Sequence, residues 1–325
     1  MILVFGAPRS GTSWLAKIFD SHPDVLYRHE PDSERKHPDI PFLCTNEKAE
    51  ELLPVAGPYL RSLVHVRTLK SAGSLPAFPK AYCTGPCALV RRGWIYGARV
   101  AEKIVGKRSW ITVPDFSGAA RRAEVRFVMK SVDSMGRLNL FARAVPEAKI
   151  VVVLRHPCGQ VDSVMRGLRS GYLAQAAILA MARMEQAKRR GLDEDALRAM
   201  TLEQQLAWNW GLLNEKALED VEGRANVLVL RYEDLCTDPL GVAQRMFEFA
   251  ELSWSESTAR FLDVSSTYSG SERYFQVVRN SRRAAEKWRE QLKDAQIAQI
   301  LDVASQTLPG RLYEPDAAVA PAGRI

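Results

Sequence analysis

FGAPRSGTSW, at residues 5–14, is a turn between a short apolar run and a helical pattern. The run Ile2–Phe5 has the length and composition of a buried strand, and residues 13–20 (SWLAKIFD) place their large apolar side chains on one helical side. Backbone amides at the start of a helix, together with the positive end of its dipole, bind an anion without a charged side chain. The stretch therefore predicts a strand, a phosphate-binding turn and a helix in succession.

The turn lacks the lysine of the phosphate-binding pattern G-x-x-x-x-G-K-[ST]. In that pattern the lysine reaches the transferred phosphoryl group and the hydroxyl holds magnesium. Here Gly6 and Gly11 keep the glycine spacing, Thr12 occupies the lysine position, and Arg9 precedes the Ser-Gly step. We predict a turn that grips phosphate but is poorly equipped for metal-assisted phosphoryl transfer. A nucleotide-binding phosphotransferase remains an alternative.

The rest of the chain alternates apolar runs with helical patterns, which is typical of an α/β fold. Four runs have the character of buried parallel strands: Ile2–Phe5, Val125–Met129, Ile150–Leu154 and Val227–Leu230. A basic residue follows each of them: Arg9, Lys130, Arg155 and Arg231. Because ligands of such sheets bind at the carboxyl ends of the strands, we expect these four side chains to border one crevice. The predicted fold is a three-layer, P-loop-type parallel sheet flanked by helices.

Length and composition favour a single domain. The 325 residues are 46% hydrophobic, enough for a sizeable core over residues 1–310, and residues 311–325 have the composition of a flexible tail. Residues 31–117 are rich in Pro and Gly, and they predict an inserted substrate cap with short helices. No run reaches the ~18 apolar residues of a membrane span, and no charged leader precedes an apolar run. We therefore expect a cytoplasmic protein without a transmembrane segment.

Charge and cysteine content exclude other classes. Five cysteines without a repeated spacing argue against a disulfide scaffold, and Cys83 and Cys87 are expected to be free thiols in a loop. A net charge of +7 favours anionic ligands. A nucleic-acid-binding module has the right sign of charge, but no helix-turn-helix, zinc-finger or RNA-reading motif accompanies it. We expect no nucleic-acid partner.

Several motifs together resemble the sulfotransferases that use 3′-phosphoadenosine 5′-phosphosulfate (PAPS). PRSGTSWL is similar to that family's loop for the 5′-phosphosulfate, and RHPCGQVDS resembles its 3′-phosphate motif, with Ser163 eight positions after Arg155. The likeness is closest to the carbohydrate 6-O-sulfotransferases, through the stretches HPDVLYRHEP, VMKSV, RYEDL and RNSRRAAEKWR. The ordered series of matches covers most of the chain.

The resemblance implies which residues hold the donor. Arg9 would face the bridging oxygen of the leaving phosphate, where preorganised charge lowers the barrier. The amides and hydroxyls of residues 10–13 (Ser10, Gly11, Thr12 and Ser13) would hold the 5′-phosphate and the sulfate. Arg155 would grip the 3′-phosphate with its planar fork, and Ser163 would add a hydroxyl. The family's R-D-P-R is Arg155-His156-Pro157-Cys158 here, so an aspartate and a second arginine are absent.

The resemblance also implies an acid–base group and an adenine site. Glu30 is the candidate general base toward the acceptor hydroxyl. His29 is the rival base, expected to point away from Glu30 if the stretch is extended. Lys130 would stabilise the sulfate or the acceptor. Trp14 and Tyr232 would frame the adenine, one by stacking and the other by a hydrogen bond, although both could instead be core aromatics, the commoner fate of a Trp at a helix start. The late phosphate loop would come from Arg279, Asn280 and Ser281.

The expected function is transfer of a sulfuryl group from PAPS to a hydroxyl of a glycan, a glycolipid or a glycosylated metabolite, with adenosine 3′,5′-bisphosphate (PAP) as the product and without a metal. A tyrosine, a lipid or a small hydroxylated metabolite is the alternative acceptor. The sequence leaves a homodimer open.

Overall fold

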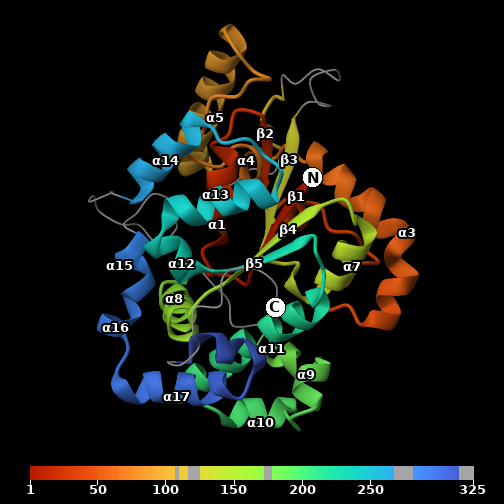
Figure 1. Ribbon diagram of the computed structural model, residues 1–325, viewed down its shortest axis with the longest axis vertical. Helices are drawn as coiled ribbons and strands as arrows, with labels where there is room; N and C mark the ends of the chain where they lie inside the picture. The colour runs from red at the N-terminus through yellow and green to blue at the C-terminus, as the bar shows by residue number, and fades with distance from the viewer. Residues whose placement is uncertain (107–109, 116–124, 172–177, 267–280, 315–325) are drawn as a thin grey trace.

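The computed structural model describes residues 1–106, 110–115, 125–171, 178–266 and 281–314. Its centre is a parallel sheet with the strand order β2-β3-β1-β4-β5 (Figure 1). The strands are β1 (Ile2–Phe5), β2 (Val25–His29), β3 (Arg126–Ser131), β4 (Lys149–Leu154) and β5 (Val227–Arg231). All five strands run in one direction, so their carboxyl ends lie at the same edge.

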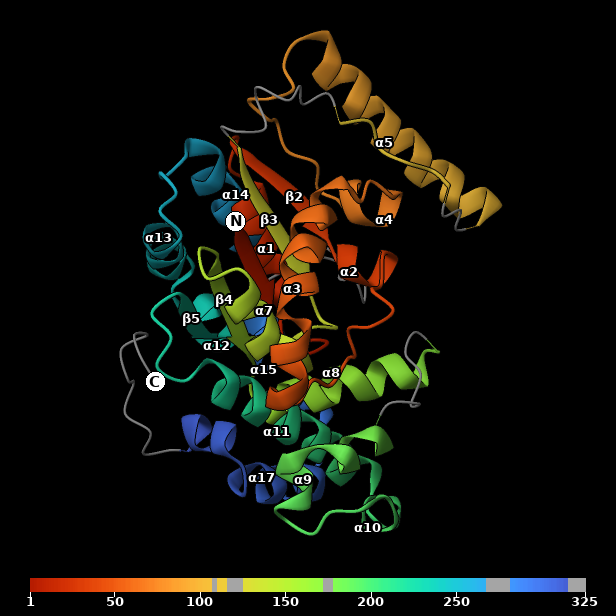
Figure 2. The ribbon, with the colours of Figure 1, turned by 90° about the vertical axis from the view of Figure 1, so that its right-hand side faces the viewer.

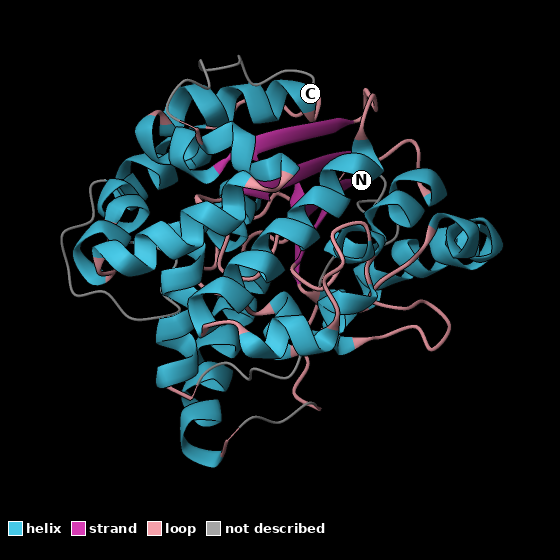
Figure 3. Cartoon of the chain, turned by 90° about the horizontal axis from the view of Figure 1, so that it is seen from below, coloured by secondary structure: helices cyan, strands magenta, loops and turns pink. Residues whose placement is uncertain are grey.

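Alternating side chains of the strands enter two cores. Leu3 and Phe5 of β1 pack on one face with α3 (Asn46–Ser62), α7 (Leu138–Ala144) and α11 (Leu202–Val221). Ile2 and Val4 pack on the other face with α1 (Thr12–Asp20), α13 (Pro239–Phe249) and α14 (Glu256–Ser266). This period of two is what a strand buried on both faces requires. Figure 3 shows helices covering both faces of the sheet, which confirms the predicted three-layer α/β fold.

A third core lies beyond the carboxyl edge of the sheet, where α8 (Pro157–Arg169), α11 and α17 (Asp294–Ser305) pack together. Met181 and Met184 are buried in it. The remaining helices are α2 (Pro31–Glu34), α4 (Leu69–Ala72), α5 (Pro86–Val105), α9 (Glu185–Lys188), α10 (Glu194–Ala199), α12 (Tyr232–Thr237), α15 (Ser281–Glu286) and α16 (Trp288–Gln291). Short 3-10 helices are η1 (Leu63–His65), η2 (Met135–Arg137), η3 (Leu179–Arg183) and η4 (Leu308–Tyr313).

The structure adds one strand to the four expected. The additional strand is β2, which the sequence pattern did not predict because Arg28 and His29 interrupt its apolar run. Arg28 is nevertheless fully buried, where its guanidinium pairs with Asp115 and donates to the carbonyl oxygens of Val64 (2.9 Å) and Tyr27 (3.1 Å). A paired and hydrogen-bonded arginine is tolerated inside.

The segment 31–117 differs in part from the expected cap of short helices. It contains two long helices, α3 with 17 residues and α5 with 20. α3 packs against α7 as part of the main core, whereas α5 lies away from the sheet (Figure 2). Cys87 lies in the first turn of α5 and not in a loop, while Cys83 is buried. No helix in the described part of the chain is long and apolar enough to cross a membrane.

Candidate active site at the carboxyl edge of the sheet

The predicted site residues come from neighbouring strand ends. β1 is the central strand, and it leads into the turn of residues 6–11. β3 and β2 lie on one side of β1 and end near Lys130 and Glu30, while β4 lies on the other side and ends at Arg155. Because the connections leave β1 and its neighbours in opposite directions, this is the position at which open α/β sheets form a ligand crevice.

Backbone geometry closes the turn tightly. Gly11 has φ +97°, and a Cβ added there would lie 2.2 Å from the ring of Tyr232. A Cβ on Gly6 would lie 2.5 Å from Ser10 Oγ and 2.6 Å from Thr12 Cγ2. Both glycines are therefore required by contact within the chain, Gly11 also by its left-handed backbone.

The start of α1 is prepared for an anion. Gly11 is the N-cap and provides no side-chain oxygen, and the first turn contains no acidic residue. The first amides and the positive end of the dipole are thus left to a ligand. Ser10 is fully buried, and its Oγ has no hydrogen-bond partner among the described residues. A buried hydroxyl of this kind calls for a partner, and a phosphate oxygen is one that it would serve.

The two predicted anion-binding arginines lie side by side. Arg9 Nε donates to Ser163 Oγ at 3.0 Å, although 154 residues separate them. Arg155 Nη1 donates to the carbonyl oxygen of Arg9 at 3.0 Å, and its Nη2 donates to Ala284 O at 2.8 Å. The first turn of α8, which follows Arg155, contains no acidic residue. The structure therefore brings both guanidinium groups, Ser163 and two helix starts into one positively charged region.

The two aromatic residues assigned to adenine are core side chains in this structure. Trp14 Nε1 donates to Ser265 Oγ at 3.1 Å, and the indole meets the ring of Tyr232 edge to face. Tyr232 is 1% exposed, between Gly11 and the guanidinium of Arg155, whose Cζ is 5.0 Å from the ring centroid. Tyr232 packs against the turn at Gly11, and Trp14 packs against Tyr232. Their contact with adenine stays a prediction.

Glu30 lies between two lysines. Its Oε1 accepts from Lys130 Nζ at 2.5 Å and its Oε2 is 3.0 Å from Lys70 Nζ. Lys130 is 3% exposed, and Lys70 is brought from α4. Burial acts to raise the pKa of Glu30, but the charge and hydrogen bond of Lys130 and the charge of Lys70 outweigh it and lower the pKa to about 2. The carboxylate is therefore ionised at neutral pH.

The expectation that His29 points away from Glu30 is wrong. Glu30 has φ +47°, ψ +50°, a left-handed conformation that ends the extended strand at His29. His29 Nε2 consequently lies 3.7 Å from Glu30 Oε1, and Nδ1 is 3.0 Å from Tyr27 Oη. Burial and the charge of Lys130 lower the pKa of His29 to about 3, so the ring is neutral. His29 is a neighbour of Glu30 and not a separate base on the far side.

Sequence reasoning missed two residues that complete this edge. Lys70 reaches Glu30 from 40 positions away, in a segment with weak periodicity, so no local signal marks it. Glu233, in the RYEDL motif, accepts from the backbone amide of His156 at 3.0 Å and from Tyr313 Oη at 3.3 Å. The RYEDL motif, which is visible in the sequence, was the signal that could have identified Glu233. Arg231 pairs with Asp234 at 2.7 Å, so this strand-end arginine joins a carboxylate.

The remaining predicted residues divide into two groups. Arg279 and Asn280 lie outside the described residues, and Ser281 opens α15. Trp288 is buried and stacks on the ring of His156 with 4.7 Å between centroids, which is a structural contact. His156 thus occupies the position of the missing aspartate as a packed ring, and burial with nearby arginines lowers its pKa to about 4.

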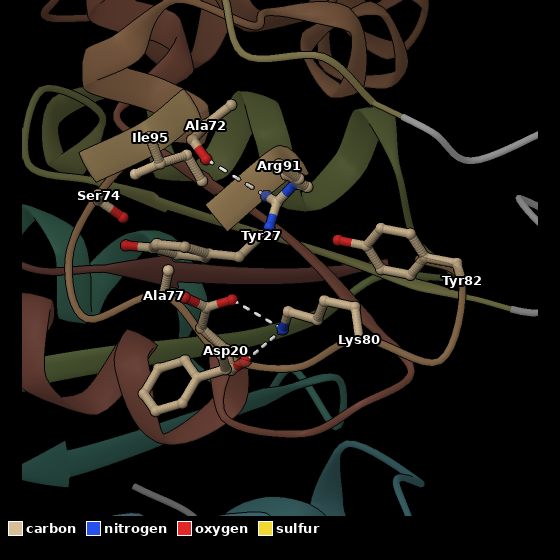
Figure 4. Close-up of a pocket in the computed structure, with 10 residues that line it drawn as sticks. Asp20, Tyr27, Ala72, Ser74, Ala77, Lys80, Tyr82, Arg91 and Ile95 are labelled. Atoms are coloured by element: carbon tan, nitrogen blue, oxygen red, sulfur yellow. Dashed lines mark hydrogen bonds and ion pairs between the residues drawn. The ribbon is translucent and has the colours of Figure 1, made fainter. Parts of the chain in front are cut away.

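A second polar cluster lies at the far end of α1. Asp20 pairs with Lys17 Nζ at 2.7 Å and with Lys80 Nζ at 2.9 Å, and all three residues are buried. Figure 4 shows Asp20 and Lys80 beside Tyr27, Tyr82 and Arg91. The cavity enclosed there measures about 10 Å³, enough for one water molecule and not for a substrate. We assign this cluster to folding.

Asp20→Asn is expected to lower the free energy of unfolding by about 3–5 kcal/mol, because it leaves two buried ammonium groups without a carboxylate. Urea denaturation measures this loss. Glu51→Gln, in the exposed pair with Lys48, is the control and should cost about 0–1 kcal/mol. The lysines lower the pKa of Asp20 against its burial. The stabilisation is therefore complete above the ordinary pKa of ~4 and falls as pH drops toward the lowered one.

Known proteins similar to this chain bear on the site. A family model described as the sulfotransferase family matches residues 2–256. The chain is 23% identical to carbohydrate sulfotransferase 1 of Rattus norvegicus, with 90% of this chain and 74% of that protein aligned. It is 24% identical to carbohydrate sulfotransferase 2 of Mus musculus, with 97% of this chain and 65% of that protein aligned.

Two solved structures are also similar. One is a sulfotransferase domain from the curacin biosynthetic pathway, with a TM-score of 0.45, 16% identity and coverage of 94% of this chain and 96% of that one. The other is mouse sulfotransferase SULT7A1 complexed with PAP, with a TM-score of 0.42, 11% identity and coverage of 97% and 84%.

Proposed function

The chain belongs to the sulfotransferase family, and we propose that it transfers a sulfuryl group from PAPS to a hydroxyl of a carbohydrate-type acceptor. The observation that carries this proposal is the junction of Arg9, Ser163 and Arg155 at 3.0 Å contacts, on the same sheet edge as the ionised Glu30. An enzyme that must hold two phosphate groups of one nucleotide needs two adjacent cationic positions.

The residues present fit such a donor. The buried Ser10 hydroxyl and the first turns of α1 and α8, both without acidic residues, provide donors and positive potential. When bound, the donor supplies a sulfuryl group whose bridging oxygen departs with the phosphate. Arg9 would neutralise charge at that oxygen, and Arg155 with Ser163 would hold the 3′-phosphate. The shared contact of Arg9 and Arg155 fixes one relative to the other.

Glu30 would accept the proton of the attacking hydroxyl. Its left-handed backbone and the 2.5 Å contact with Lys130 hold the carboxylate at the crevice. A carboxylate with a pKa of about 2 is a weak base, but a bound anion near Lys130 and Lys70 would oppose their charge and raise that pKa. Glu30 then becomes more basic only when the donor is in place.

A groove beside α2 supports a carbohydrate-type acceptor. It has a volume of about 460 Å³, within the range of small-molecule sites, and begins at the opposite end of α2 from Glu30. Its lining combines cations with prolines and an aromatic ring, which suits a sugar bearing anionic groups: Arg35, Lys36, His37, Pro54, Val55, Pro58, Tyr59 and Ser62. Two of the relatives described above are named carbohydrate sulfotransferases.

A thermal-shift measurement tests the donor. PAP at 100 times its dissociation constant should stabilise the protein by ~2.7 kcal/mol and raise the melting temperature by about 5 °C. ATP with magnesium, at the same concentration, should leave it within 1–2 °C of the free protein by the same relation. A larger rise in melting temperature with ATP and magnesium than with PAP would contradict the proposal and favour a phosphotransferase. Incubation with labelled PAPS and a panel of glycans, phenols and lipids then identifies the acceptor class.

A further inference from the structure

α5 projects from the body of the molecule (Figure 2). Most of its contacts with the described chain lie on one side: Ile95 is buried, Arg91 Nη2 donates to Ala72 O at 3.5 Å, and Arg99 donates to Gly73 O at 3.1 Å and Leu69 O at 2.9 Å. Outside that side, the half-exposed Trp94 donates from Nε1 to Thr112 O at 2.9 Å. Arg91, Ile95 and Arg99 recur every four residues, so they mark a single inner face. That face carries the charges that fasten α5 to α4.

The opposite side of α5 is apolar and open. We define the outer face by its exposed apolar side chains and by the small residues between them: Leu89, Val90, Gly93, Trp94, Tyr96, Gly97, Val100, Ala101 and Ile104. Leu89 is 74% exposed and Ile104 79%. No Asp, Glu, Lys or Arg is among these residues, and the nearest charge on the helix is the guanidinium of Arg92, which lies over the Tyr96 ring at the border of the face, 5.9 Å from its centroid. A charge-free apolar surface of this length on a monomer marks an interaction site.

Two glycines occupy the middle of the outer face, one helical turn apart. A Cβ at Gly93 or Gly97 would meet no atom of the described residues within 4 Å, so neither glycine is required by packing against that part of the chain. Glycine within a helix is nevertheless unfavourable relative to alanine. Small residues four apart let a second helix approach the backbone closely. The glycines are therefore explained by a helical partner and not by this chain alone.

We propose that the outer face of α5 binds the outer face of α5 in a second copy of this chain. A two-fold contact brings the same surface together twice, and the absence of charge on it avoids like-charge repulsion. Its six large apolar side chains expose roughly 400 Å² per copy, judged from their exposed fractions. That is most of the ~500 Å² of apolar surface that a standard homodimer interface buries on each partner.

A membrane surface fits the outer face less well. A helix in a bilayer interface gains from bulky apolar side chains along the centre of its apolar face. Glycines at that centre remove the area that lipid would cover, whereas they shorten the distance between two helices. The dimer is an inference beyond the proposed reaction, and it holds whichever acceptor the enzyme uses.

Sedimentation equilibrium of the full chain at micromolar concentration tests the dimer. The expected mass is twice 36.4 kDa. Gly93→Leu combined with Gly97→Leu should reduce it to 36.4 kDa, because the added side chains have space in the monomer but block close approach. Val100→Glu should do the same. Val264→Glu is the matched control, since Val264 on α14 is 53% exposed and Val100 is 58%, and it should remain dimeric.

Circular dichroism of each variant verifies that the helices are retained. A wild-type chain that is monomeric at tens of micromolar overturns the proposal, as does a dimer that persists in both α5 variants. Flotation with vesicles of phosphatidylcholine and phosphatidylglycerol tests a lipid surface as the alternative partner of the outer face. A monomer that floats with these vesicles, and loses this property in Val100→Glu, would assign the outer face to lipid and would also overturn the dimer.

Discussion

Glu30→Gln is expected to lower kcat by roughly 10²- to 10⁴-fold while the affinity for PAP changes little, because the substitution removes the proton acceptor and keeps the shape of the side chain. Gln retains an oxygen that can accept from Lys130, whose contact with Glu30 is 2.5 Å in the wild type. Steady-state kinetics with saturating PAPS gives kcat, and calorimetric titration with PAP gives the affinity.

Glu34→Gln is the matched control for this prediction. Glu34 is the last residue of α2, the short helix that Glu30 precedes, and its Oε1 is 3.6 Å from the Lys70 ammonium that also contacts Glu30. The two substitutions remove the same charge beside the same lysine, but only Glu30 lies at the sheet edge. Full activity of Glu30→Gln would reject Glu30 as the base, and a large loss in His29→Gln alone would transfer the role to His29.

The pH profile provides a second reading of Glu30. In the free enzyme its pKa is about 2, so kcat/KM should show no acid limb from this group above about pH 3. The bound donor brings negative charge toward Lys130 and stabilises protonated Glu30, so the acid limb of kcat should lie at higher pH. An acid limb in kcat that is missing from the Glu30→Gln profile is the expected signature.

Arg155→Ala is expected to weaken PAP binding at least 30-fold, equivalent to ~2 kcal/mol or more for removal of a buried hydrogen-bonded charge that faces an anion. Arg155 is 3% exposed and donates to Arg9 O and Ala284 O, so its loss also releases the turn. Calorimetric titration with PAP measures the affinity. Arg155→Lys should recover part of it, because the charge remains and the planar fork is lost.

Arg143→Ala controls for the general effect of removing an arginine. Arg143 of α7 pairs with Glu50 of α3 at 2.6 Å, away from the carboxyl edge of the sheet. Its substitution should leave the affinity for PAP within twofold of the wild-type value. An unchanged PAP affinity in Arg155→Ala, with the fold intact by circular dichroism, would refute the anion-binding role of this arginine. Equal losses in the two variants would instead indicate a nonspecific charge effect.

Local pattern predicted the centre of the fold and not its periphery. β1 and β4 are continuous apolar runs, and their burial on both faces follows from that alone. β2 escaped because Arg28 is buried only through a partner, Asp115, that lies 87 residues away. The length of α5 was not predicted either. Its two glycines and its exposed apolar residues do not give the pattern of a helix packed on a core, and only the structure shows which of its faces is buried.

The candidate site shows the same limit. Arg9, Ser163, Arg155, Glu30 and Lys130 were identified from motifs, and the structure places them along one edge. Lys70 and the orientation of His29 depended on tertiary structure: one on where α4 packs, the other on the left-handed conformation of Glu30. A motif specifies residue types at fixed spacings, whereas these contacts arise from distant segments.

Arg9 has φ +71°, a conformation that costs an L-residue free energy and persists only when its surroundings impose it. The hydrogen bond from Arg155 to the Arg9 carbonyl is part of that constraint. For the proposed donor, recognition of its two ends would thereby be coupled: a ligand that fails to engage Arg155 would also meet a less well-ordered Arg9. Discrimination against nucleotides without a 3′-phosphate would then exceed the free energy of one lost contact.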